Sequence, residues 1–239
     1  QLHEVLEIIL NEDFKMSKKI REKRIEKCPK TYNFYHQILS ISLNMMPIES
    51  NIKYVLRMLK YALKEQQFHQ FYSSLNYLFP DKSKWPASVA FIHCKSIWET
   101  GKRKEAIEKI DSILKDPLFM PQIEADPKLK CKMYYMYAEW IFNNSLLTSV
   151  FHVLKTVVDL LEVSMRTKVR FYKSFHRWAW GCSLMFSRAP NVKQHAVSAI
   201  HGFLECIKLK KETPFDDLVQ MISLFFKVNL DEKSFEEIS

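Results

Sequence analysis

The chain has 239 residues, of which 47% are hydrophobic and 13% are aromatic. This composition excludes an intrinsically disordered chain, and the length allows one or two globular domains. The formal net charge of +9 permits a polyanionic partner, but bases and acids alternate, as in residues 102–109, which favours solvated helix faces over a dedicated polyanion site.

Glycine is scarce, with three residues in 239, far below the usual share of about 7%. Tight β-hairpin turns and phosphate-binding loops depend on residues that tolerate positive φ. Connections between helices need far fewer such residues. The sequence therefore predicts an all-α fold.

The first predicted element is a basic helical region within residues 1–30. Its bases are Lys15, Lys18, Lys19, Arg21, Lys23, Arg24, Lys27 and Lys30. The apolar stripe beside them is thin, with Phe14, Met16, Ile20 and Ile25. This pattern favours a solvated helix at the edge of the fold over a nucleic-acid-binding or lipid-binding surface.

Stacked helix pairs are predicted over residues 48–239. Proline inside a helix costs about 3 kcal/mol, so the nine prolines are expected at helix ends or in loops. Ser50 and Asn51 are predicted to cap a helix whose apolar stripe runs from Ile52 to Leu63. A second stripe occupies residues 68–79 after a very short gap, which predicts an antiparallel helical hairpin.

The same unit recurs along the rest of the chain. Further helices are predicted at residues 86–99, 102–115, 127–143, 146–163, 168–188, 192–211 and from 214 to beyond 231. The period of about 35 residues is typical of tetratricopeptide and related helical repeats. We therefore expect one segment over residues 1–239, an α-solenoid of antiparallel helix-hairpin repeats of the tetratricopeptide or HEAT type.

One unit resembles half of a tetratricopeptide repeat in its letters, at residues 97–117. Gly101 is expected to turn the chain between two helices, and the small Ala106 to let them approach closely. Packing anchors are expected at the tryptophans Trp98, Trp140, Trp178 and Trp180. In the aromatic run at residues 171–180, the i, i+4, i+7 spacing of Phe171, Phe175 and Trp178 favours a core stripe over a base-stacking platform.

No catalytic motif is present in the sequence. The three glycines are isolated from one another, which excludes a phosphate-binding loop or a dinucleotide fingerprint, and protein-kinase signatures are absent. A serine or cysteine triad that forms only in space stays open. The nearest approach to a metal set is His176, Cys182, His195, His201 and Cys206. Their spacing matches no zinc pattern, which favours partly buried packing residues and no metal.

The cysteines indicate a reducing compartment. Their number is odd, they lie far apart and no CxxC pair occurs, so a disulfide framework is disfavoured. We expect the cytoplasm, with the nucleus as an alternative. The sequence has no signal peptide and no apolar run of about 18 residues, so neither secretion nor a membrane span is predicted. Because the sequence begins with Gln1, the chain is expected to be part of a longer polypeptide.

Several segments resemble the FAT region of target of rapamycin (TOR) kinases, which belong to the phosphatidylinositol 3-kinase-related kinases. Residues 171–179 (FYKSFHRWA) resemble that family's W-Y-K-A-W-H-x-W-A stretch. Residues 196–209 are similar to its A-V-x-G-F-x-x-S-I-x-L helix, and residues 217–226 to its D-x-L-R-x-L-T-L-W-F. Residues 20–24, 37–43 and 47–49 follow the family order upstream, and Trp98 and Trp140 fall at family tryptophan positions. Phe175 and Phe226 replace family tryptophans, which indicates a divergent member.

The resemblance implies a non-catalytic helical scaffold of a serine/threonine protein kinase. Such a scaffold would clamp and organise a C-terminal kinase domain, which would hold ATP and Mg²⁺, and it would support homodimer contacts and contacts with subunits of a TOR-type complex. Some members hold an inositol polyphosphate such as inositol hexakisphosphate in this region. Lys102 and Arg103 fall where the family has a basic pair, whereas Met136 stands near a family lysine.

Two other functional classes stay open at this point. A free-standing tetratricopeptide-like adaptor would capture a peptide in its concave groove and would end in polar capping helices. A nucleic-acid-binding solenoid would use the bases of residues 15–30 and would bind with a steep salt dependence. Nucleic acid is disfavoured as a partner, and an enzyme is the least favoured class.

Overall fold

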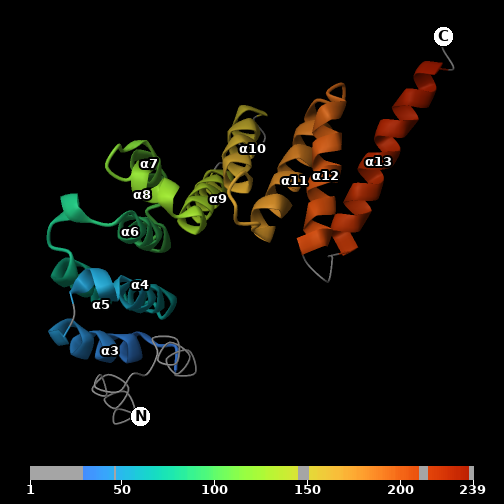
Figure 1. Cartoon of the computed structure of the whole chain (residues 1–239). Coiled ribbons are helices and arrows are strands. Elements are labelled where there is room, and N and C mark those ends of the chain that lie inside the picture. Colours follow the sequence, from blue (N-terminus) through green and yellow to red (C-terminus); the bar gives the residue numbers. More distant parts are fainter. Residues whose placement is uncertain (1–28, 46, 145–150, 210–214, 237–239) are drawn as a thin grey trace. The chain divides into compact units, whose positions relative to one another are not determined.

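The computed structural model describes residues 29–45, 47–144, 151–209 and 215–236. Within these ranges the chain forms α-helices and one 3₁₀ helix, without a strand (Figure 1). The elements are α3 (Tyr32–Met45), α4 (Ile48–Lys64), α5 (Phe68–Leu78), η2 (Lys82–Lys84), α6 (Ala87–Glu99), α7 (Arg103–Lys115), α8 (Met120–Ala125), α9 (Pro127–Asn144), α10 (Phe151–Met165), α11 (Tyr172–Arg188), α12 (Lys193–Leu209) and α13 (Phe215–Glu236). The predicted all-α helical-repeat fold is confirmed.

The chain divides into two compact units, residues 1–101 and residues 102–239. The first contains α3 to α6 and the second contains α7 to α13. Each unit is a stack of helices in its own right. The continuity of one array over residues 1–239 stays a prediction, and the basic region that the sequence places in residues 1–30 lies almost wholly outside the described residues.

In the first unit α4 is the central helix, because α3, α5 and α6 all pack on it. Its buried side chains, among them Val55 and Leu59, lie one helical turn apart and form a continuous apolar stripe. Tyr35 of α3 stacks on Tyr61 of α4 with ring centroids 5.5 Å apart. Phe71 brings α5 into the same core.

The ends of α4 differ from the sequence-based expectation. The helix begins at Ile48 behind Pro47, so Ser50 and Asn51 do not cap it. Pro47 is a favourable entry because its fixed φ and missing N–H suit a helix start. Asn51 is buried inside the helix and donates a hydrogen bond from Nδ2 to the Pro47 carbonyl.

A Schellman motif ends α4 and allows the short connection to α5. The amide of Gln66 donates to the Leu63 carbonyl, and the amide of Gln67 donates to the Ala62 carbonyl. Gln66 adopts a positive φ of 57°, which glycine normally supplies at this position. The predicted hairpin over residues 52–79 is therefore present, with a turn whose chemistry the sequence did not reveal.

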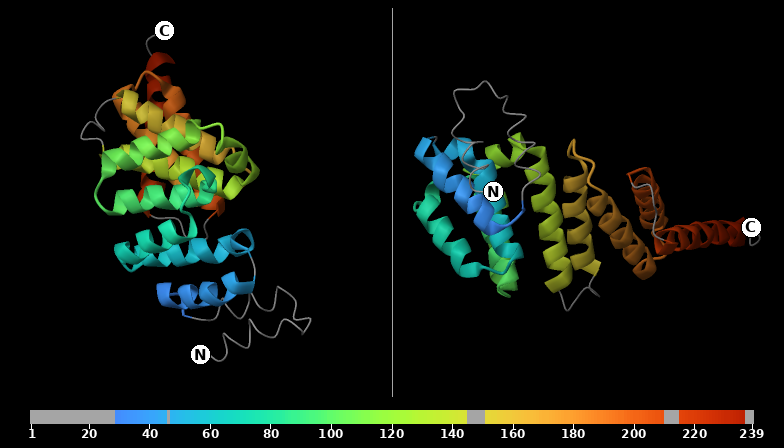
Figure 2. Two further views of the ribbon diagram at one scale, coloured as in Figure 1. Left: turned by 90° about the vertical axis from the view of Figure 1, so that its left-hand side faces the viewer. Right: turned by 90° about the horizontal axis from the view of Figure 1, so that it is seen from below.

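In the second unit, successive helices pack on each other from α9 to α13 (Figures 1 and 2). Helices α7 and α8 pack against the α9 side of this row. One continuous apolar core runs through the unit from α9 to α13, and its fully buried members include Leu154, Val157, Leu161, Ala179 and Ala199. The stack therefore places α11 between α10 and α12, where it has neighbours on two faces.

Two described helices were not expected from the sequence, α3 and α8. Helix α8 is short, and Pro121 occupies its first turn, where proline is tolerated. Helix α10 begins at Phe151 in the described part of the chain, so its predicted start at residue 146 lies outside that part. Helix α13 begins at Phe215 in the described part of the chain, next to the start predicted near residue 214.

Candidate functional site

The predicted polyphosphate residues lie on open surface at the start of α7. Lys102 precedes the helix and forms an exposed ion pair with Glu105, with 3.6 Å between Nζ and Oε2. Arg103, the first residue of α7, is exposed as well. Both side chains are exposed to solvent, and neither lines the groove described next.

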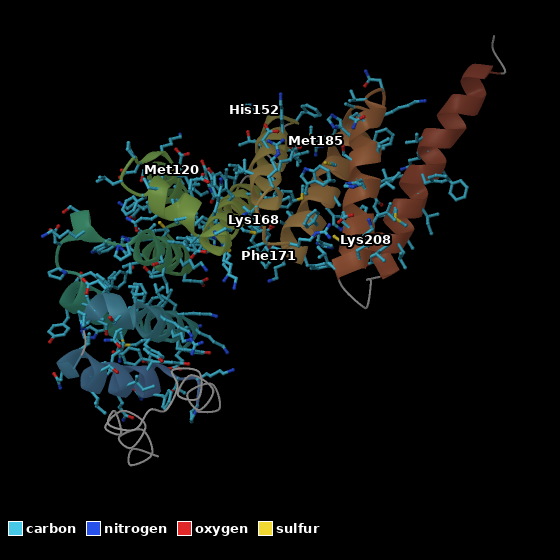
Figure 3. The ribbon with its side chains drawn as sticks, viewed as in Figure 1. Met120, His152, Lys168, Phe171, Met185 and Lys208 are labelled. Atoms are coloured by element: carbon cyan, nitrogen blue, oxygen red, sulfur yellow. The ribbon has the colours of Figure 1, made fainter. Side chains whose placement is uncertain are left out.

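A separate groove with basic lining lies between the α8–α9 corner and the segment that joins α10 to α11. Lys130, Arg166 and Lys168 line it together with Glu124, and Lys168 is labelled in Figure 3. Lys130 donates from Nζ to both carboxylate oxygens of Glu124 at 2.7 Å. Arg166 pairs with Glu162 at 3.1 Å. Two of its three bases are therefore compensated by acids of the same unit.

The expected packing anchors differ in their burial. Trp140 and Trp178 are buried, and so is Ala106. The side chains of Trp98, Phe175 and Trp180 are partly buried. Gly101 has a φ of +84°, a left-handed conformation that an L side chain rarely adopts, in agreement with the turn expected there.

Helices α11 and α12 cross at very short range because of Gly202. A Cβ atom built on Gly202 would lie 2.9 Å from Cβ of Ala179 and 2.9 Å from Cε3 of Trp178. Both neighbours are buried, and neither can swing away as a long flexible side chain would. Glycine at this position therefore sets the separation of the two helices.

Asp217 connects α13 to α11 through a buried carboxylate. Trp180 Nε1 donates to Asp217 Oδ1 at 3.0 Å, and His176 Nε2 lies 3.1 Å from the same oxygen. The Asp217 side chain is 3% exposed, so the hydrogen bonds stabilise a charge that is largely withdrawn from water. The interaction fixes the first turn of α13 on one position of α11.

A second polar contact joins α11 to α9 through Arg177 and Glu139. The guanidinium donates from two of its nitrogens to the two carboxylate oxygens, which is the bidentate geometry of strong pairs. Arg177 also lies over the ring of Phe142, 4.7 Å from its centroid. Burial, together with the charge of Glu139, raises the pKa of the neighbouring Tyr135 to about 12.

A third contact joins the segment before α11 to α12. Arg170 and Lys208 both donate to the carboxylate of Glu205, Lys208 at 2.7 Å. The hydrogen bond from Lys208 and the charge of Arg170 hold the pKa of Glu205 below its usual range. Lys208 extends from the C-terminal end of α12, where a cation is favoured by the helix dipole (Figure 3).

A buried serine pair joins α9, α10 and α11. Ser164 Oγ donates to the Cys131 carbonyl at 2.9 Å and lies 2.7 Å from Ser174 Oγ. Small polar side chains of this kind let helices approach closely while their own hydrogen bonds stay satisfied. Helix α11 thus makes a directional polar contact with α9, α10 and α13, and the segment before α11 makes one with α12.

The histidines and cysteines considered from the sequence as a metal set do not form a metal-binding group within the described ranges. Those ranges contain no group of three or more His, Cys, Asp or Glu side chains placed to hold a metal ion. Burial raises the pKa of the Cys182 thiol to about 12 and that of Cys206 to about 12, so both stay protonated and poorly nucleophilic at neutral pH. His176 is engaged with Asp217.

The contact residues Glu139, Glu205 and Asp217 were not assigned a role by the sequence reasoning, although Glu205 and Asp217 lie within segments that resemble the TOR family and Glu139 precedes Trp140, a family tryptophan position. Each pairs with a residue 35 to 41 positions away. Such separations match one repeat of about 35 residues. A search for complementary polar residues one repeat apart was the signal that could have found them.

No helix in the described part of the chain combines the length and the apolar character that crossing a membrane requires. A family model described as FAT domain matches residues 1–223. No curated protein matches the chain.

Proposed function

Because the chain belongs to the FAT domain family, whose model covers 223 of its 239 residues, we propose that it is the non-catalytic scaffold of a TOR-type serine/threonine protein kinase. In this proposal the helical stack clamps and organises a kinase domain that lies C-terminal to it. The stack also supports contacts with subunits of a TOR-type complex or with a second copy. ATP and Mg²⁺ belong to the kinase domain.

The family match is the observation that carries the proposal, and the packing of the second unit supports it. A scaffold must hold its surface in a fixed shape, and directional polar contacts specify helix register more strictly than apolar packing alone does. Here such contacts occur where α11 meets α9, α10 and α13, and between α12 and the segment before α11. A stack built in this way can position a neighbouring domain without any chemistry of its own.

The first experiment is the mass of the native polypeptide, measured by immunoblot of source cells with an antibody against this segment. We expect a band many times heavier than 28.5 kDa, the mass of this chain. A band near 28.5 kDa would instead indicate the free-standing peptide-binding adaptor.

The second experiment tests the clamp in the immunopurified parent polypeptide. Gly202→Ala should loosen the α11–α12 crossing and reduce phosphate transfer to a protein substrate. Lys104→Ala is the matched control, because Lys104 is exposed on α7 and should tolerate truncation. Equal phosphate transfer by the two variants and the parent would argue against a scaffold that organises the kinase domain.

Inositol polyphosphate binding at Lys102 and Arg103 is a separate part of the proposal. The open setting of these residues makes their charge the main source of affinity, so binding should weaken steeply as salt rises. Titration calorimetry with inositol hexakisphosphate at low salt tests it. Absence of heat, or binding that a Lys102→Ala/Arg103→Ala variant retains, would remove this site.

A further inference from the structure

In its described part, helix α13 is attached to the second unit by fewer buried side chains than α12 is. Helix α12 buries six of its 17 residues. Within residues 216–228, where the structure describes the side chains of α13, only Asp217 and Leu224 are buried. Met221 and Val228 pack on the core but stay partly exposed. Because burial of apolar area is the main favourable contribution to packing, α13 gains less from docking than α12 does.

Asp217 provides the polar part of this attachment. Its Oδ1 atom accepts a hydrogen bond from Trp180 Nε1 and lies 3.1 Å from His176 Nε2. Its Oδ2 atom is also buried, and it has no hydrogen-bond partner in the described part of the chain. A buried acceptor that loses its water without gaining a donor carries a desolvation cost. Docking of α13 therefore combines a gain at Oδ1 with a loss at Oδ2.

Two other acids that join elements of this unit have cationic partners. Glu139 pairs with the guanidinium of Arg177, and Glu205 pairs with one arginine and one lysine. No arginine or lysine of the described ranges pairs with Asp217, whose partners are an indole and an imidazole that is charged only when protonated. A carboxylate gains more from a guanidinium or an ammonium, which add an opposite charge to the hydrogen bonds. The contact that holds α13 is therefore the weakest of the three.

We propose that α13 is a detachable helix, which undocks as a unit while α9 to α12 stay folded, and that Asp217 controls the undocking. Undocking returns both carboxylate oxygens of Asp217 to water, which offsets part of the loss at Oδ1. Local opening of this kind occurs where few buried apolar contacts hold an element. It also uncovers the indole of Trp180, which packs on the core and on the ring of Phe203. The docked and undocked states therefore present different surfaces on α11.

Hydrogen–deuterium exchange of the 239-residue chain, followed by mass spectrometry, tests the proposal because it measures the opening of each helix separately. In the parent chain, and relative to intrinsic rates, peptides from α13 should exchange at least about tenfold faster than peptides from α11 and α12. Asp217→Ala should speed the exchange of α13 by a further factor of about ten to thirty, the loss expected for a buried hydrogen-bonded carboxylate. The exchange of α10 to α12 should stay unchanged.

Asp216→Ala is the matched control for this variant. Asp216 lies in the same first turn of α13 and is exposed, and of the two acids only Asp217 hydrogen-bonds to α11 in the described structure. Both carboxylates interact favourably with the dipole of α13, and both substitutions introduce the same helix-forming residue. Asp216→Ala should therefore change the exchange of α13 by no more than a few-fold.

A variant on the other side of the contact tests whether Asp217 acts through α11. Trp180→Phe removes the indole donor and keeps an aromatic ring on the core. It should speed the exchange of α13 in the same way as Asp217→Ala. The double variant should lose less protection than the two single effects multiplied together, because both substitutions remove the same hydrogen bond.

The comparison of helices in the parent chain needs no variant, so the proposal can fail even if a variant does not fold. Equal protection of α13, α11 and α12 would overturn it, because the helices would then open together. Faster exchange of all helices in Asp217→Ala would also overturn it, since the carboxylate would then stabilise the whole stack. An effect of Asp217→Ala no larger than that of Asp216→Ala would show that the buried contact does not control undocking. Selective exchange of α13, with coupling between Asp217 and Trp180, supports the proposal whether or not the parent polypeptide is a kinase.

Discussion

Replacement of Gly202 by alanine tests the close crossing of α11 and α12. The new Cβ would lie 2.9 Å from Cβ of Ala179 and 2.9 and 3.1 Å from two ring carbons of Trp178. Ordinary contacts between carbon atoms lie at about 3.5–4.0 Å, so the helices must separate or the indole must shift. Either movement disturbs the core that the two helices share.

The net effect combines two opposing contributions. Overpacking a core by one methyl group costs about 1–3 kcal/mol, and the upper end applies because both neighbours are buried and stiff. Alanine is favoured over glycine inside a helix by about 1 kcal/mol, which offsets part of this cost. We expect Gly202→Ala to lower the free energy of unfolding by about 2 kcal/mol, equivalent to a fall in Tm of about 4–8 °C for a chain of this size.

Urea and thermal unfolding followed by tryptophan fluorescence and circular dichroism measure this effect. Gly181→Ala is a close comparison, because its Cβ would meet a single atom, Cγ2 of Val158 at 3.0 Å, and the helix gain roughly compensates. Ala179→Gly in the Gly202→Ala background removes one of the clashes and should recover part of the loss. A Gly202→Ala variant as stable as the parent would refute the close crossing.

The remaining predictions concern other parts of the fold. Gln66→Gly should raise the free energy of unfolding by roughly 0.5–1 kcal/mol, because glycine tolerates the φ of 57° that ends α4; a lower Tm would contradict the Schellman assignment. Trp178→Ala should cost about 3–5 kcal/mol, since the ring is buried, and an unchanged Tm would refute its core role. Asp217→Ala should cost about 2 kcal/mol, with a smaller loss for Asp217→Asn, which keeps Oδ1 as the acceptor. Burial raises the pKa values of Cys182 and Cys206 to about 12. The contribution of these thiols to the free energy of unfolding is therefore fully present below the ordinary thiol pKa of about 9 and is lost as pH rises from 9 toward 12. A urea midpoint at pH 10.5 equal to that at pH 8 would contradict the burial of these thiols.

The repeating helices could be predicted from the sequence because apolar spacing is a local property. The stripes that begin at Ile52 and Phe68 correspond to α4 and α5, and the helix start predicted near residue 214 corresponds to the start of α13 at Phe215. Helix α8 was not among the predicted helices, although Pro121 lies in its first turn, at a helix end where the prolines were expected and where proline is tolerated. The start of α4 was misplaced because Ser50 and Asn51 imitate a capping signal two residues inside the helix.

The polar contacts of the stack could not be predicted residue by residue, because their partners belong to different repeats. Ser164 and Cys131 lie 33 positions apart, Arg170 and Glu205 lie 35 apart, and Trp180 and Asp217 lie 37 apart. In an array in which each repeat packs on the next, equivalent positions meet after one period, so these separations follow from the architecture.

The period alone does not select the pairs, however. With 36 basic and 27 acidic residues in 239, many opposite charges fall about one repeat apart by chance, and most such pairs on exposed helix faces contribute little. What distinguishes Glu205 and Asp217 is that their carboxylates are buried, and burial depends on how closely the helices approach. Gly202 sets that approach for α11 and α12, the helices to which the partners His176, Trp180 and Lys208 belong. The glycine and the acids therefore depend on one another: if Gly202→Ala separates the two helices, Glu205 should become more exposed and its hydrogen bonds should lose strength in water.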